Sequence, residues 1–246
     1  MLRKRLRMTL VFSVTVVALA EFAVLAGMKL PHFGGTRPSA DHPVLVELFD
    51  SQGCSKCPPA EIELNALADR PEVLALSFAV TYWDRLGWKD PYGSDWYAAR
   101  QLDYADNGKG RLATPEFVIN GRRVVIGSDR PTLDDVIDKA GPPQAGPDIS
   151  ADATYVHVAA APAEGWAATI WLVRYDSRTI RTQVSAGENS GRTLVQRNVV
   201  RELIDLGRWT GDNTLYAVPR VHLPGLASAV LVQRGRGGPI VSAHKI

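Results

Sequence analysis

The chain has 246 residues, 46% of them hydrophobic and 22% charged, with a formal net charge of +2. This composition is typical of globular proteins and excludes a largely disordered chain, and the length allows one large domain or two of about 100 residues. The net charge is small and no further basic cluster follows the one at the N-terminus, which argues against nucleic-acid binding.

The N-terminal segment has the pattern of an export signal. Four basic residues lie within residues 1–7, an uncharged apolar run follows over residues 8–20, and this run ends in "ALA", which a signal peptidase can read. A membrane anchor over residues 8–28 is the alternative, with Glu21 inside the span. We therefore predict a signal peptide or anchor with its linker over residues 1–35. The folded part is expected to be periplasmic or secreted, and to touch the membrane only through this segment if it is not cleaved.

The next hundred residues are predicted to form an α/β domain over residues 41–141. Near-continuous apolar runs are typical of strands buried on both faces, and Asn-Gly is a strong hairpin signal. In chain order we expect a strand at 44–49, a helix that ends before Pro71, a strand at 73–83, a helix from Ser94 to Asn107, a hairpin around Asn120-Gly121 and a helix at 131–140.

A change of composition marks the second half of the chain. Residues 142–150 contain three prolines and are predicted to be a linker. Residues 151–246 consist mainly of short strand-like runs, and only residues 191–207 have the pattern of a helix. We therefore predict a β-rich domain of sandwich type over residues 151–246.

The only two cysteines, Cys54 and Cys57, suggest redox chemistry. A metal site normally needs about four suitable ligands, and the five histidines are scattered, so no metal is expected. A structural disulfide over this spacing would remove little chain entropy. Helix-start N–H groups and Lys56 favour a thiolate instead. Pro58 and Pro59 remove two of these donors, so the helix is expected to begin nearer Cys57 than Cys54. Its N-terminus should then stabilise a Cys54 thiolate less.

The order strand, CxxC, helix, a further βα unit and then Thr-Pro before a hairpin resembles the thioredoxin fold over residues 41–141. The resemblance implies a cis Pro115 beside the cysteines and a substrate groove next to Thr114. It also implies that Cys54 attacks, that Cys57 resolves the mixed disulfide and that no external cofactor is needed.

Glu47 is the only charged residue in the first buried strand. The same resemblance implies that Glu47 is a catalytic proton carrier close to the second cysteine. The alternative is a solvated carboxylate at the edge of the sheet. Because burial of an unpaired carboxylate is costly, the position is a candidate for function.

An aromatic insertion, "TYWDRLGWKDPYGSDWY", departs from the ordinary thioredoxin pattern. One interpretation is a platform near the cysteines on which Trp83 and Trp88 bind a peptide substrate. The other is that these rings pack as the core of the insertion itself, as aromatic residues most often do.

Four segments carry a more specific resemblance: "VELFDSQGCSKCPPAE", "YWDRLGWKDPYGS", "TPEFVINGR" and "GENSGRTLVQRNVVRELIDLGRW". They are similar to the bacterial secreted proteins of domain-of-unknown-function family 1223. This resemblance implies a thioredoxin-like domain followed by a β-sandwich and supplies no established reaction. The polar residues between 188 and 201 are interpreted as an anion site, as a contact between domains or as a hydrogen-bonded loop network.

Two functional hypotheses follow. The first is an exported thiol–disulfide oxidoreductase that acts on protein disulfides through Cys54 and Cys57, with protein thiols or a redox protein as partners. The second is a non-enzymatic exported binding module with a thioredoxin-like fold, in which the cysteines form a structural disulfide.

Overall fold

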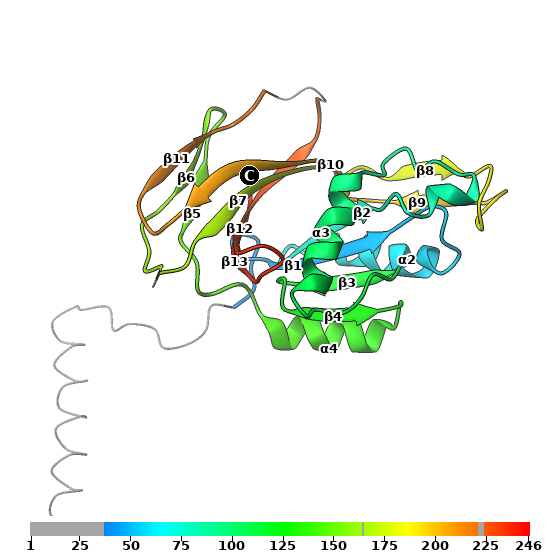
Figure 1. Ribbon diagram of the computed structural model, residues 1–246, viewed down its shortest axis with the longest axis horizontal. Helices are drawn as coiled ribbons and strands as arrows, with labels where there is room; N and C mark the ends of the chain where they lie inside the picture. Colours follow the sequence, from blue (N-terminus) through cyan, green and yellow to red (C-terminus); the bar gives the residue numbers. More distant parts are fainter. Residues whose placement is uncertain (1–36, 164, 221–223) are drawn as a thin grey trace, which may run out of the picture. The chain divides into compact units, whose positions relative to one another are not determined.

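An eight-stranded mixed sheet runs through the described part of the chain, which comprises residues 37–163, 165–220 and 224–246 of a computed structural model (Figure 1). Its strands are, from one edge to the other, β13 (Ile240–Lys245), β12 (Ala227–Arg234), β7 (Ala168–Asp176), β10 (Val199–Trp209), β2 (Val73–Ala79), β1 (Val44–Asp50), β3 (Glu116–Ile119) and β4 (Arg123–Ile126). The predicted export segment, residues 1–35, lies outside the described residues. Within the described ranges no helix is long and apolar enough to cross a membrane.

Three helices cover the end of the sheet that carries the cysteines: α2 (Cys57–Leu67), α3 (Asp95–Asp106) and α4 (Arg130–Ala140). Strand β1 is buried along its whole length, and its side chains alternate between the two faces of the sheet. Val46 packs in the same core as α2 and α4, whereas Leu45 and Phe49 pack in the core that contains Tyr104 of α3. The predicted order of strands and helices over residues 41–141 is therefore found.

Local signals account for several boundaries. Ser94 accepts a hydrogen bond from the Trp96 N–H and caps α3 as predicted. Asn120 and Gly121 have φ angles of 48° and 60°, as a tight turn between β3 and β4 requires. The second strand ends at Ala79 rather than at residue 83, because the N–H of Ser94 bonds to the Ala79 carbonyl and the chain leaves the sheet there.

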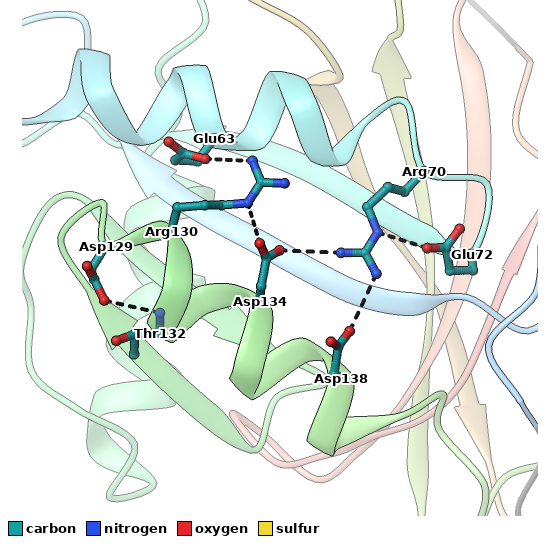
Figure 2. Close-up of polar contacts among 8 residues, drawn as sticks. All are labelled: Glu63, Arg70, Glu72, Asp129, Arg130, Thr132, Asp134 and Asp138. Carbon is teal, nitrogen blue, oxygen red and sulfur yellow. Dashed lines mark hydrogen bonds and ion pairs between the residues drawn. The ribbon is translucent and has the colours of Figure 1, made fainter.

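Helices α2 and α4 are joined at the surface by ion pairs (Figure 2). Arg130 of α4 contacts Glu63 of α2 at 2.8 Å and Asp134 at 2.6 Å. Because these groups are partly solvated, each such pair contributes at most about 1 kcal/mol. The buried contacts of Leu64 and Ile137 in the core below are the stronger support for this packing.

Strands in the second half form two further sheets. A three-stranded sheet contains β11 (Thr214–Ala217), β6 (Tyr155–Val158) and β5 (Ile149–Ala151), and a hairpin pairs β8 (Ile180–Gln183) with β9 (Thr193–Gln196). Apolar residues of β6 and β11 share a core with β7, β10, β12 and β13 around the fully buried Trp209. The three-stranded sheet is thus a second layer on the large sheet.

The helix predicted over residues 191–207 is wrong. The segment forms β9 and then β10, an eleven-residue strand that pairs antiparallel with β7 along nearly its full length. Asn198, between the two strands, has a φ of 51°, which breaks a right-handed helix. Pairing with β7 therefore outweighs the helical pattern, and the β-branched Val199 and Val200 suit the buried strand.

The large sheet crosses the predicted boundary between the two halves. Strand β10 pairs with β2 through Val199 and Ser77, and the described residues belong to one compact unit. The segment predicted as a linker, residues 142–150, packs closely on β13. Gly146 lies so near the Val241 backbone that an added Cβ would collide with it. The second half is therefore in place to contribute residues to the loop between β1 and α2, residues 51–56, which we call the cysteine loop.

Candidate functional site: the cysteine loop and its covering hairpin

The cysteines lie where β1 passes into α2. Cys57 is the first residue of α2, and its N–H donates to the Cys54 carbonyl at 3.1 Å, so the two residues are one turn apart. Pro58 and Pro59 occupy the first turn, where missing N–H donors cost little. The helix thus begins at Cys57, as predicted. Both thiols are free, and each residue is only 1% exposed.

The surroundings make the two thiols unequal. A hydrogen bond from Cys57 lowers the pKa of Cys54 from its ordinary value of 9.0 to about 6, against the opposing effect of burial. Thr114 and the backbone N–H groups of Lys56 and Cys57 lower this pKa further. Burial raises the pKa of Cys57, and the hydrogen bond to Cys54 and the charge of Asp50 add to this. Cys54 therefore ionises first.

The Thr-Pro pair predicted to lie beside the cysteines is there. The Thr114–Pro115 peptide bond is cis, and the Cys54 sulfur lies 3.8 Å from the Thr114 carbonyl oxygen. The indole N–H of Trp83 donates to the Thr114 hydroxyl at 2.7 Å. The Trp88 indole donates to the Gln52 side chain at 3.0 Å. Both tryptophans therefore border the cysteine loop, and their role in substrate binding stays a prediction.

A loop from the second half covers the cysteines. It comprises residues 184–192 between β8 and β9, and we call it the covering loop. The Glu188 carboxylate accepts hydrogen bonds from the Ser55 N–H at 3.0 Å and the Ser55 hydroxyl at 2.7 Å. The Asn189 amide donates to the carbonyls of Gln52 at 2.9 Å and Cys54 at 2.8 Å. This contact supports two of the interpretations of residues 188–201, a contact between halves and a loop network.

Close approach of two glycines brings the covering loop onto the cysteine loop. Gly187 has a φ of 72°, and an added Cβ there would lie 3.5 Å from the Gly53 Cα. An added Cβ on Gly53 would lie 3.3 Å from the Trp83 Cβ. The positive φ of Gly187 favours glycine where the covering loop meets the cysteine loop, and the space beside Gly53 is limited by Trp83.

Replacing Asn189 by alanine is expected to uncover Cys54. The substitution removes both hydrogen bonds to the cysteine loop and leaves two buried carbonyls without them, which should lower the free energy of unfolding by about 1–3 kcal/mol. The rate of Cys54 alkylation by iodoacetamide should rise. Ser190→Ala is the matched control, because the Ser190 hydroxyl bonds only within the covering loop. Equal alkylation rates in the two variants would contradict a shielding role.

Two buried acids lie behind Cys57. Asp50 ends β1, Glu61 follows Cys57 by one helical turn, and the Ser77 hydroxyl contacts their carboxyl oxygens at 3.3 Å and 3.1 Å. Burial raises the pKa of Asp50 well above its usual range, and the adjacent Glu61 raises it further. The sequence analysis missed both acids. The available signal was an acid at i+4 from Cys57 together with one at the end of a buried strand.

Glu47 is placed away from the cysteines. It lies on the face of β1 that packs against α3, and it is 0% exposed. Its carboxylate contacts Arg100 at 2.7 Å and accepts a hydrogen bond from the Tyr104 hydroxyl at 2.6 Å. The interpretation of a solvated edge residue is therefore wrong. The structure does not bring Glu47 to Cys57, and Asp50 is the acid that lies there.

No metal site emerges from the described side chains, since no three His, Cys, Asp or Glu residues among them come together to hold an ion.

The structural comparisons find two similar proteins. The crystal structure of protein AGR_C_4864 from Agrobacterium tumefaciens is 25% identical, with a TM-score of 0.70 over 86% of this chain and 95% of that one. HBP35 of Porphyromonas gingivalis is 13% identical, with a TM-score of 0.57 over 87% of this chain and 76% of that one, and this likeness shows the fold alone. No curated protein matches the chain.

One family model matches the chain. It covers residues 45–233, which include the cysteine loop, the aromatic insertion and the covering loop. Because the match extends over most of the sequence, the chain belongs to the family described as proteins of unknown function, DUF1223.

Proposed function

We propose that this protein is an exported thiol–disulfide oxidoreductase with a thioredoxin-like domain, which acts on protein disulfides through Cys54 and Cys57. The observation that carries the proposal is the unequal pair, in which the pKa of Cys54 is about 6 and that of Cys57 is raised. The Thr114 carbonyl oxygen, 3.8 Å from the attacking sulfur, supports it. The partner is a protein with an exchangeable disulfide or dithiol, and no external cofactor takes part.

The first step is attack by the Cys54 thiolate on one sulfur of the partner disulfide. A Cys54–partner bond forms and the partner S–S bond breaks, and the departing partner sulfur takes a proton from water. The Cys57 sulfur then attacks Cys54, the enzyme disulfide forms, and the second partner sulfur is released. Two electrons pass from the enzyme dithiol to the partner, and a dithiol protein returns them in the next cycle.

Asp50 is suited to accept the Cys57 proton in the second step. Burial raises the pKa of Asp50, so its carboxylate is a stronger base than that of a free aspartate. Its charge already acts on Cys57. Glu61 lies beside Asp50 and raises the pKa of Asp50 further.

The burial of Cys54 favours the second candidate, a binding module. Cys54 is covered by the loop that carries Glu188 and Asn189, and a partner protein reaches its sulfur only when this loop moves. A module with a permanent disulfide needs no such movement. The two functions differ in reduction potential, because structural disulfides lie below about −300 mV and exchangeable ones lie higher.

Replacing Cys57 by serine should trap the mixed disulfide. With a hydroxyl in place of the resolving thiol, a peptide that contains one disulfide should accumulate as an adduct on Cys54, read by mass spectrometry of the intact protein. Cys54→Ser is the matched control and should give no adduct. Absence of an adduct in Cys57→Ser, or an equal adduct in both variants, would remove the oxidoreductase and leave the binding module.

A further inference from the structure

Gln101 is a fully buried side chain of α3 that links two other segments of the chain. Its amide nitrogen donates to the Ala113 carbonyl at 2.7 Å and to the carboxyl group of Glu116. Its amide oxygen accepts from the Tyr82 hydroxyl at 3.2 Å. Gln101 therefore ties the segment 113–116 to the aromatic insertion.

The two linked segments meet at Thr114, beside the cysteines. The insertion contributes Trp83, whose indole N–H donates to the Thr114 hydroxyl at 2.7 Å. Ala113, which Gln101 holds by its carbonyl, directly precedes Thr114. The Thr114 carbonyl oxygen lies 3.8 Å from the Cys54 sulfur. A hydroxyl that accepts from an indole keeps its own proton to donate, so the Thr114 hydroxyl is free to donate to a nearby sulfur.

The position of Thr114 affects the ionisation of Cys54. The hydrogen bond from Cys57 lowers the pKa of Cys54 most, and a hydrogen bond from the Thr114 side chain lowers it further. Hydrogen bonds to a charged group depend steeply on distance and angle. A displacement of Thr114 should therefore weaken its effect on the thiolate.

We propose that Gln101 is a positioning residue, which holds Thr114 against the Cys54 sulfur and so stabilises the attacking thiolate. The inference rests on the proposed function, in which Cys54 attacks. Glu116 fixes the orientation of the Gln101 amide, because a carboxyl oxygen accepts from the nitrogen end and not from the oxygen end. Burial raises the pKa of Glu116 to about 7, and a carboxyl group keeps an acceptor oxygen in both protonation states.

Replacing Gln101 by leucine, which is similar in size, tests the proposal. The iodoacetamide rate of the reduced full chain, measured at a series of pH values, should have its midpoint raised from about 6, by about 0.5–1 pH unit. Tyr104→Phe is the matched control on the same helix, because it removes a buried hydroxyl that bonds to Glu47 at 2.6 Å. It should lower the free energy of unfolding and leave the midpoint unchanged. An equal shift in both variants, or none in Gln101→Leu, would overturn the proposal.

A second pair of variants shows whether Gln101 acts through Thr114. Thr114→Val removes the hydroxyl and should raise the midpoint by itself, and adding Gln101→Leu should then cause no further rise. A further rise would overturn the positioning role. If Gln101→Leu does not fold, the double variant with Glu116→Leu leaves no carboxyl group without its donor and should show the same shift. Alkylation needs no partner disulfide, so a failure here and a failure of the Cys57→Ser trapping experiment are distinguishable.

Discussion

Replacing Arg100 by methionine should lower the free energy of unfolding by about 3–5 kcal/mol, because it leaves the Glu47 carboxylate buried without a counter-charge. Both side chains are almost fully buried, and they meet at 2.7 Å between β1 and α3. The guanidinium also donates to Gln233 at 2.9 Å and to the Tyr104 hydroxyl at 3.0 Å. Arg100 therefore ties α3 to strands from both halves of the chain. Urea unfolding followed by circular dichroism measures the loss.

Two controls separate the buried charge from a general effect of losing arginine. Arg236 forms an ion pair with Asp103 on the surface, so Arg236→Met should change stability by less than about 1 kcal/mol. The double variant Glu47→Met with Arg100→Met should recover part of the loss, because it removes the stranded charge. A destabilisation of Arg100→Met no greater than that of Arg236→Met would contradict this account.

The rate of Cys54 alkylation should follow a titration with a midpoint at about pH 6. The thiolate is the reactive species, and the pKa of Cys54 is lowered from 9.0 to about 6 chiefly by the hydrogen bond from Cys57. Replacing Cys57 by alanine removes that bond and should move the midpoint upward. The measurement is the iodoacetamide rate of the reduced protein at a series of pH values. A midpoint near that of free cysteine in the wild type, or the same midpoint in Cys57→Ala, would contradict the assignment.

The same pKa has consequences for stability and potential. Because the folded-state pKa of Cys54 lies below its unfolded value, ionisation of Cys54 stabilises the reduced fold above pH 9.0, and this contribution is lost as the pH falls through about 6. The gap in unfolding free energy between reduced wild type and Cys54→Ser should therefore widen as the pH rises from about 6 towards 9.0. At pH 7 the ionised thiol stabilises the dithiol relative to the disulfide, which raises the reduction potential of the pair.

The sequence predicted the elements that depend on local signals. The uninterrupted apolar run of β1, the Ser94 cap and the Asn120-Gly121 turn each determine the chain conformation over a few residues. The position of Thr114-Pro115 beside Cys54 followed from the resemblance to thioredoxins rather than from a local signal. These features were all predicted to within a few residues.

Contacts between distant segments could not be predicted in the same way. Glu47 was recognised as an unusual buried acid, but its partner Arg100 lies 53 positions away on α3. No sequence pattern indicated which side of that helix faces Glu47. The covering loop approaches Cys54 from 135 positions further along the chain. Residues 191–207 carry a helical pattern, but pairing with β8 and β7 makes them the strands β9 and β10. Local propensity cannot report such pairing.

The distance along the chain between the cysteines and their cover has a consequence for biosynthesis. Asn198, directly before β10, bonds to the Ala75 carbonyl of β2 across 123 positions. The covering loop precedes Asn198 and is separated from it by β9. Chains emerge from the ribosome N-terminus first, so Cys54 and Cys57 are made long before the residues that enclose them. A nascent chain therefore presents both thiols openly to any oxidant or isomerase, and that access closes when the last third of the polypeptide arrives.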